Sequence, residues 1–249
     1  MAPTMRVLIL GGTAEARSLA ARLSGAPDVE VVSSLAGRVR DPRLPEGEVR
    51  IGGFGGATGL QDWLRDNAIR AVLDATHPFA ARISGNAAAA TTRSGLPFAV
   101  VQRPPWSPRP GDNWLEVDSL EAAAAALPDL GRRVFLTIGR QGVDRFATVD
   151  ADFLVRAIDP PEGPTPARMT LLLDRGPFEV GRESALLREH DIDVLVSKNS
   201  GGDLTVAKLT AARELGVPVV MIRRPPNPLG ATVFDGVDEA ERWLLAVLD

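Results

Sequence analysis

The sequence predicts an α/β protein made of two Rossmann-like lobes with parallel sheets, internally duplicated. Short apolar runs alternate with stretches of helical periodicity along the chain, which is the pattern of βαβ units. The middle of the chain also contains an internal repeat. One set of residues recurs 123 positions later, and a second set recurs 121 positions later. The first set is Gly53, Leu64, Arg65 and Ile69, matched by Gly176, Leu187, Arg188 and Ile192; the second is Gly95, Pro97, Arg103, Pro104 and Pro105, matched by Gly216, Pro218, Arg224, Pro225 and Pro226. A chain of 249 residues is long enough for two such domains.

The first lobe is expected to alternate strands and helices from its start. Met5–Leu10 is a short apolar run, and apolar residues of the following Ala14–Leu23 recur every three or four positions, as on one face of a helix. Further strands are predicted at Val29–Ser33, Ala71–Leu73 and Pro97–Gln102, and further helices at Thr58–Asn67 and Arg82–Ser94.

The second lobe repeats this alternation. Its predicted strands are Trp114–Val117, Arg133–Ile138, Phe153–Ile158, Met169–Leu173, Val194–Val196 and Val217–Ile222, and its clearest helices are Ser119–Leu127 and Thr205–Leu215. A strand at Thr232–Phe234 and a helix at Asp238–Leu248 end the chain, with Ala240, Trp243, Leu244, Val247 and Leu248 as the apolar face of that helix.

Two Arg-Pro-Pro exits, at Arg103 and Arg224, set the expected domain boundaries. Proline-rich segments are stiff and extended, so residues 104–111 and 225–230 are predicted to be linkers that cross between the lobes. Two crossings bring the chain back to the first lobe. Residues 1–103 with 231–249 are therefore expected to form an NADP-binding lobe and residues 112–224 a substrate-side lobe, with the final helix packed on the first.

The composition excludes several functional classes. The chain has no cysteine, which rules out disulfides and thiol catalysis, and only two histidines, so no metal site is expected. No apolar run reaches membrane-span length, and no basic, apolar leader opens the chain, so we expect a cytoplasmic protein without membrane contact. A net charge of −4 argues against nucleic acid as the main partner.

The first predicted strand ends in a glycine-bearing turn before a helix. This order presents backbone N–H groups and the positive end of a helix dipole to a phosphate. The residues assigned to a dinucleotide here are Gly11, Gly12, Thr13, Ala14 and Glu15. The dinucleotide fingerprint with its third glycine is not met, so a turn that only allows close helix packing is the alternative.

The end of the second strand indicates which dinucleotide. About 20 residues after the glycines, an NAD-binding unit usually carries an acid for the ribose hydroxyls. This chain has Ser33 and Ser34 there, followed by Arg38 and Arg40. Hydroxyls and a guanidinium suit a 2′-phosphate, so we predict NADPH as cofactor, held by Ser33, Ser34 and Arg38. The alternative is that the two arginines are solvated loop charges.

The two copies differ most in the loop after the repeated buried strand, which is DATHPFA from Asp74 and SKNSGG from Ser197. Ligands bind at the carboxyl ends of strands in open α/β sheets, so two different loops predict two different ligands. Thr76, His77 and Pro78 are assigned to the cofactor, and Arg140, Lys198, Asn199, Ser200 and Gly201 to an anionic substrate. The alternatives are an exposed structural histidine, a glycine-rich turn that caps a helix, and a duplication without bearing on function.

Six segments together resemble the precorrin-6A reductase family of cobalamin biosynthesis. In chain order they are GGTAEAR, SSLAGR, DATHPFA, TIGRQG, DRGPF and SKNSGG, and they cover nearly the whole chain. The resemblance implies an NADPH-dependent reductase that delivers hydride to one ring double bond of precorrin-6A and gives precorrin-6B. The substrate, a flat macrocycle fringed with carboxylates, needs the wide cleft that two lobes can provide. Water, His77 and Lys198 are the candidate proton donors.

Three other functions stay open at this point. A related branch of the family acts on the cobalt complex of the same macrocycle with NADH or NADPH. No single residue decides between the branches, and Arg38 favours the metal-free branch that uses NADPH. A non-catalytic NADP-binding sensor would need only the first lobe's loops. A two-lobed small-molecule binding protein would need neither the glycine turn nor Arg38. Beyond precorrin-6A itself, neighbouring enzymes of the corrin pathway are the expected partners.

Overall fold

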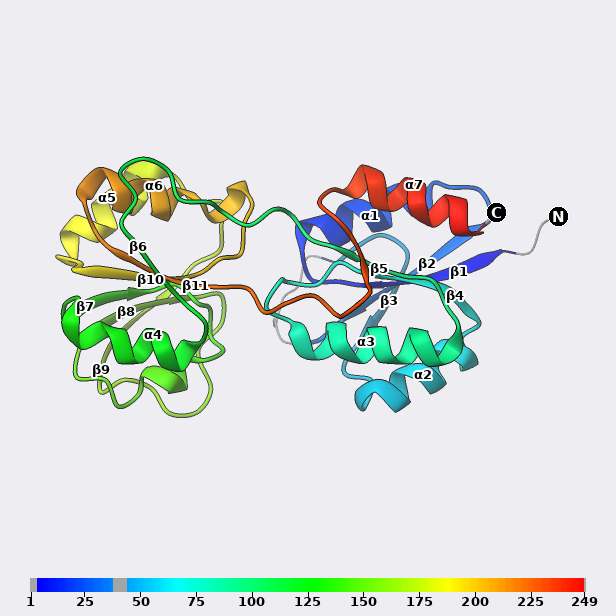
Figure 1. The fold of residues 1–249 in the computed structure, drawn as a ribbon, viewed down its shortest axis with the longest axis horizontal. Helices are drawn as coiled ribbons and strands as arrows, with labels where there is room; N and C mark the ends of the chain where they lie inside the picture. The colour runs from blue at the N-terminus through cyan, green and yellow to red at the C-terminus, as the bar shows by residue number, and fades with distance from the viewer. Residues whose placement is uncertain (1–3, 38–43, 249) are drawn as a thin grey trace. The chain divides into compact units, whose positions relative to one another are not determined.

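The computed structural model describes residues 4–37 and 44–248. The chain divides into two compact units, Met1–Pro104 with Pro225–Asp249, and Pro105–Arg224 (Figure 1). Each unit contains one six-stranded sheet with helices on both of its faces. The predicted α/β class with two parallel sheets is therefore confirmed.

The first unit has the strand order β12-β5-β4-β1-β2-β3. Its strands are β1 (Met5–Leu10), β2 (Val29–Leu35), β3 (Glu48–Ile51), β4 (Ile69–Asp74), β5 (Phe98–Val101) and β12 (Thr232–Phe234). Its helices are α1 (Ala14–Ser24), α2 (Gly56–Asp66), α3 (Ala81–Ser94) and α7 (Val237–Leu248). All neighbouring strands run parallel, so their carboxyl ends share one edge, called here the carboxyl edge.

The second unit has the order β6-β11-β10-β7-β8-β9, again all parallel. Its strands are β6 (Trp114–Val117), β7 (Arg133–Leu136), β8 (Asp152–Ala157), β9 (Arg168–Leu173), β10 (Val194–Lys198) and β11 (Val219–Ile222). Its helices are α4 (Leu120–Ala126), α5 (Val180–Glu189) and α6 (Ala207–Leu215), with 3₁₀ turns η1 (Leu127–Asp129), η2 (Val143–Phe146) and η3 (Asp203–Thr205).

Both sheets share one topology. The strands β5, β4, β1, β2 and β3 of the first sheet occupy the places of β11, β10, β7, β8 and β9 in the second. This is the strand order of the Rossmann fold. The sixth place is exchanged: β6 follows β5 along the chain but pairs with β11, whereas β12 follows β11 but pairs with β5. The first unit is therefore completed by β12 and α7 from the C-terminal end of the chain, and the second unit by β6 and α4 from the start of residues 105–224.

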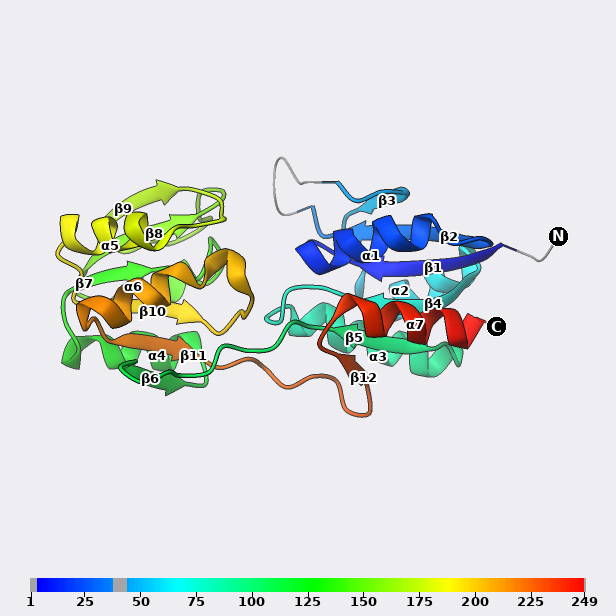
Figure 2. The same ribbon diagram turned by 90° about the horizontal axis from the view of Figure 1, so that it is seen from above.

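Apolar side chains cover both faces of the first sheet. Residues of α1 and α7 pack on one face and residues of α2 and α3 on the other (Figures 1 and 2). In the second unit, α5 and α6 share a cluster with Phe135, Leu195 and Met221 of the sheet, and α4 lies on the opposite face (Figure 1). The helical periodicity found in the sequence corresponds to these buried stripes.

The last helix packs on the first unit, as predicted. Ala240 and Leu244 are buried in the same cluster as α1, and Arg22 of α1 forms ion pairs with Asp238 and Glu241 of α7. The expected burial of Val247 is wrong, since its side chain is 39% exposed. Leu248 takes the position four residues after Leu244 and packs against the cluster in its place.

The edge strand β3 differs from the expectation. The sequence predicts no strand at Glu48–Ile51, where β3 lies, because an edge strand with two exposed ends lacks an apolar run. The division between the two units falls within the two Arg-Pro-Pro exits, after Pro104 and after Arg224. Within residues 4–37 and 44–248, none of the helices combines the length and apolarity of a membrane span.

Candidate functional site

The glycine turn of the first unit lies at the carboxyl edge, where β1 leads into α1. Thr13 is the N-cap of the helix, and its Oγ1 accepts a hydrogen bond of 3.1 Å from the N–H of Ala16. Gly12 is exposed with a φ of 114°, and a Cβ added there would meet nothing within 4 Å. An uncovered backbone next to a capped helix N-terminus leaves room for a phosphate group.

Thr13 also joins this turn to the DATHPFA loop. Its Oγ1 donates a 2.6 Å hydrogen bond to the carbonyl of Ala75, and the N–H of Ala75 donates to the carbonyl of Leu10. The two loops follow β1 and β4, which are neighbours at the point where the strand order reverses. Open α/β sheets bind ligands at that point. The structure therefore brings together two of the loops that the sequence assigns to the cofactor.

Asp74 lies beneath the second of these loops and was not assigned a role from the sequence. Its Oδ1 accepts hydrogen bonds from the N–H of Thr76 at 3.0 Å and from its hydroxyl at 2.6 Å. The side chain is 1% exposed, and within the described residues Oδ2 has no hydrogen-bond partner. Burial raises the pKa of Asp74, while nearby Ser84 and Thr76 oppose the rise. The Ser84 hydroxyl itself is directed to the Ala80 carbonyl at 3.4 Å.

His77 extends from this loop with an exposed imidazole. The N–H of Phe79 donates to His77 Nδ1 at 3.2 Å, so Nδ1 carries the lone pair. A neutral imidazole in this arrangement holds its proton at Nε2. His77 can therefore offer a hydrogen-bond donor at Nε2. The adjacent Pro78 is buried and contributes to the shape of the loop.

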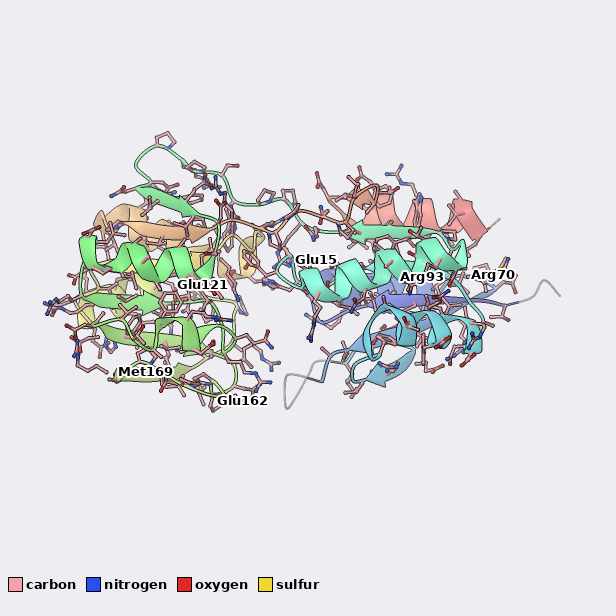
Figure 3. The ribbon with its side chains drawn as sticks, turned by 60° about the horizontal axis from the view of Figure 1, so that its bottom comes forward. Glu15, Arg70, Arg93, Glu121, Glu162 and Met169 are labelled. Atoms are coloured by element: carbon pink, nitrogen blue, oxygen red, sulfur yellow. The ribbon has the colours of Figure 1, made fainter. Side chains whose placement is uncertain are left out.

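The other residues assigned to the cofactor divide into three cases. Ser33 and Ser34 lie near the end of β2 and are 1% and 6% exposed, and within the described residues the Ser33 hydroxyl has no partner. Arg38 lies outside the described residues. Glu15 forms an ion pair of 3.0 Å with Arg103, the arginine of the first Arg-Pro-Pro exit. Figure 3 shows Glu15 at one end of the first unit and Arg70, near the start of β4, at the other.

In the second unit, Lys198 ends β10 beside β7. Its Nζ donates a 3.0 Å hydrogen bond to the carbonyl of Ile138 and so ties the SKNSGG loop to the TIGRQG loop. Burial lowers the pKa of Lys198 to about 8. Arg140 is bonded to the exposed Glu162 at 2.9 Å. The two predicted cations therefore belong to loops that meet at the carboxyl edge of neighbouring strands.

The side chain of Asn199 forms hydrogen bonds within the second unit. Its Oδ1 accepts from the N–H of Trp106 at 2.8 Å, and its Nδ2 donates to the Trp106 carbonyl at 2.9 Å. Arg224 Nε donates to the Asn199 carbonyl at 2.7 Å. Since both polar atoms of the buried amide are used, this geometry favours positioning of the loop over contact with a substrate. Ser200 is half-buried and Gly201 is buried in the same loop.

Lysine is rare in this chain, and both of its lysines lie in this region. The chain uses arginine for every cation except Lys198 and Lys208. Lys208, on α6, is 5% exposed, and its Nζ lies 5.1 Å from the centroid of a Trp106 ring. Burial lowers the pKa of Lys208 to about 7; nearby Arg156 lowers it further, while Glu183 opposes this. Unlike arginine, lysine can lose its proton at such a position.

The neighbours of Lys208 form a buried ion pair. Arg156 of β8 bonds Glu183 of α5 through two N–H groups, at 2.6 and 2.9 Å, and both side chains are almost fully buried. The Arg156 guanidinium lies 3.7 Å from the ring centroid of Phe178, in the DRGPF segment. This segment is thus anchored to the core of the second unit.

Sequence reasoning missed Asp74, Trp106 and Lys208, and also the glycine-rich segment after β3. Asp74 is part of a motif that was recognised, and the scarcity of lysine would have drawn attention to Lys208. Among the residues that the structure describes, no group of three or more histidine, cysteine or acidic side chains could hold a metal.

The comparisons with known proteins agree with this geometry. The family model described as Precorrin-6x reductase CbiJ/CobK matches residues 6–245. The chain belongs to this family. The resemblance found in the six sequence segments is thereby confirmed.

Relatives cover almost the full length. A precorrin-6A reductase of Rhodococcus erythropolis is 62% identical over 96% of this chain and 97% of its own. One of Mycobacterium tuberculosis is 53% identical over the same shares. A cobalt-precorrin-6A reductase of Methanothermobacter thermautotrophicus is 28% identical over 98% of this chain and 85% of its own. Among solved structures, CobK precorrin-6A reductase matches with a TM-score of 0.90 and 43% identity, over 98% and 97% of the two chains.

Proposed function

We propose that this protein is a precorrin-6A reductase of cobalamin biosynthesis that takes its hydride from NADPH. The observation that carries the reaction is the identity of 62% to a precorrin-6A reductase over almost the whole of both chains. The metal-free substrate is favoured, since the relatives named for the cobalt complex, at 27–29% identity, are less similar to this chain. The reaction adds a hydride to one carbon of a ring double bond and a proton to the other.

The first unit fits a dinucleotide. The uncovered Gly12 backbone, the N-terminus of α1 and the buried hydroxyl of Ser33, which has no partner among the described residues, are suited to phosphate and ribose oxygens. A reduced nicotinamide, when bound, supplies the hydride. Thr13 and Asp74 keep the glycine turn and the DATHPFA loop in one arrangement through their hydrogen bonds. In this proposal the finer preference for the 2′-phosphate comes from Ser34 and Arg38.

The second unit is assigned to the macrocycle. Lys198, Arg140 and the backbone of Ser200 and Gly201 offer charged and neutral donors to carboxylates. Lys198 stays mostly protonated at neutral pH, because its pKa of about 8 lies above 7. Asn199 is assigned to holding this loop in place.

Water, His77 and Lys198 remain the candidates for the proton. Nδ1 of His77 accepts from Phe79, so His77 could donate a proton only after Nδ1 has itself been protonated and this hydrogen bond has been given up. Lys198 presents an ammonium whose pKa of about 8 is well suited to transfer near neutral pH.

The test is anaerobic oxidation of the cofactor by the full chain. The arms are NADPH or NADH, each with precorrin-6A, with cobalt-precorrin-6A, or with no tetrapyrrole. We expect rapid oxidation of NADPH only with precorrin-6A. Faster turnover of the cobalt complex would identify the protein as a cobalt-precorrin-6A reductase. Cofactor binding without turnover of either macrocycle would favour a non-catalytic sensor.

Two variants test the assignment of the units. Lys198→Met should raise the KM for precorrin-6A while the Kd for NADPH stays unchanged. Arg38→Ala should weaken NADPH but not NADH. If Lys198→Met instead loses the cofactor and keeps the tetrapyrrole, the two units have been assigned in reverse.

A further inference from the structure

A second glycine-rich loop lies at the carboxyl edge of the first unit, and the function above does not use it. The segment Gly52-Gly53-Phe54-Gly55-Gly56 joins β3 to α2. Gly52, Gly55 and Gly56 have φ values of 118°, 78° and 93°, which side chains rarely adopt. A Cβ added to any of these three would meet nothing within 4 Å. The loop therefore needs glycine for its backbone shape, and the space above it is open.

The side chain of Arg50, the third residue of β3, forms hydrogen bonds with this loop. Its Nη1 donates to the carbonyl of Gly52 at 2.6 Å and its Nη2 to that of Gly53 at 2.7 Å. The guanidinium carbon lies 3.8 Å from the Phe54 ring centroid and 5.7 Å from a Trp63 ring centroid. Stacking on an aromatic face and two hydrogen bonds hold the planar group in one orientation.

The charge of Arg50 is not neutralised by any acidic side chain that the structure describes. Some other arginines of this unit are paired with carboxylates, for example Arg6 with Glu30 and Arg103 with Glu15. Among residues 4–37 and 44–248, no carboxylate lies within ion-pair distance of Arg50. Burial lowers the pKa of Arg50, yet a guanidinium stays charged in proteins. Two of its five N–H donors are used, and three remain for an anion.

The position of Arg50 indicates which anion. In the parallel pairing of β2 and β3, Arg50 lies opposite Ser34, and paired residues of parallel strands share one face of the sheet. The N–H of Gly52 donates to the carbonyl of Leu35 at 2.8 Å, so the loops after β2 and β3 are joined. In a Rossmann unit, the adenosine ribose of the cofactor lies at the end of the second strand.

We propose that Arg50 binds the 2′-phosphate of the cofactor's adenosine and makes the protein prefer NADPH to NADH. The inference rests on the proposed function, because it assumes that the first unit holds the dinucleotide. Arg50 would act with Ser34 across two neighbouring strands. The glycine loop below it lets the guanidinium approach the edge without a side chain in the way.

The competing explanation is that Arg50 only orders the glycine loop. In that case its removal disturbs the whole adenosine end, and NADPH and NADH lose affinity equally. A role in 2′-phosphate binding predicts a selective loss. The two explanations therefore differ in a ratio of affinities, which a general loss of stability does not change.

The experiment is titration of the full chain with NADPH, NADH, 2′,5′-ADP and 5′-AMP. The variants are Arg50→Gln, Arg50→Lys and, as a matched control, Arg65→Gln, an exposed α2 arginine paired with Asp62 and Asp66. Arg50→Gln should weaken NADPH and 2′,5′-ADP roughly 10- to 100-fold, the range of one hydrogen bond to a charged group. NADH and 5′-AMP should change less than about twofold by the same reasoning. Arg65→Gln should match the wild type.

Each result decides the question. Equal losses for all four ligands, or none, would overturn the role of Arg50. If Arg50→Gln does not fold, Arg50→Lys, which keeps the charge but not the planar fork, should lose part of the NADPH preference and none of the NADH affinity. A wild type that binds NADPH no more tightly than NADH would instead overturn the cofactor proposal, before any variant is compared.

Discussion

Replacement of Lys208 by methionine should stabilise the second unit, and more so in acid than in base. Lys208 is 5% exposed and faces Arg156, Glu183 and the Trp106 ring. Burial lowers its pKa from 10.5 to about 7. Methionine fills a similar volume and has no proton to lose, so the variant lacks the cost of keeping a charge in the interior.

The magnitude follows from the size of the shift. One pKa unit corresponds to about 1.4 kcal/mol, so below pH 7 the buried ammonium costs the folded state about 5 kcal/mol. Between pH 7 and 10.5 the unfolded chain binds more protons than the folded one, and the wild type gains stability as pH rises. At pH 9 the remaining cost is about 2 kcal/mol. The advantage of Lys208→Met should therefore shrink by about 3 kcal/mol from pH 6 to pH 9.

Urea unfolding of both proteins at pH 6, 7.5 and 9 measures this difference. The pH dependence is the decisive quantity, because any change in packing contributes equally at each pH. Lys208→Arg is the matched control, since arginine stays charged throughout and should lose stability relative to the wild type as pH rises. The same stability difference for Lys208→Met at pH 6 and pH 9 would refute the lowered pKa.

Three more predictions concern the two units. Leu244→Ala should destabilise the first unit by about 2–5 kcal/mol, since it removes a fully buried side chain of α7; thermal unfolding measures this, and an unchanged Tm would contradict the packing. Asp74→Ala should raise the KM for NADPH roughly tenfold by releasing Thr76, whereas Asp74→Asn keeps the acceptor and should stay within about threefold; equal effects would show that the hydrogen bonds to Thr76 do not matter. The KM for precorrin-6A should rise as pH increases through about 8, where Lys198 loses its proton, and Lys198→Arg should remove that rise; a profile shared by both would assign the titration elsewhere.

Most secondary structure could be predicted because it depends on local patterns. The apolar spacing in α1 and the runs of β1 and β4 correspond to buried faces in the structure. The edge strand β3 could not be predicted in this way, because exposed and half-exposed residues such as Glu48 and Arg50 form no apolar run.

The placement of candidate site residues was predictable to the level of loops. A loop that follows a buried parallel strand must lie at the carboxyl edge, so the GGTAEAR, DATHPFA and SKNSGG segments could be placed there before any coordinates. The work that each side chain does within those loops was not predictable. Asn199 was expected to bind the substrate, but its side-chain amide forms hydrogen bonds with the backbone of Trp106. Glu15 was expected to bind the cofactor, and its carboxylate forms an ion pair with Arg103.

The sequence by itself determined the α/β class, the duplication, the family and the strand ends at which the candidate loops lie. Each of these depends on residues that are close together in the sequence or regularly spaced. Tertiary structure alone decided that β6 and β12 change places between the two sheets, and which side chains meet at the carboxyl edges. Asn199 and Trp106 are 93 positions apart, and Glu15 and Arg103 are 88 apart. Such contacts depend on which strands become neighbours, and strand neighbours are chosen by the burial of the whole sheet rather than by any local pattern.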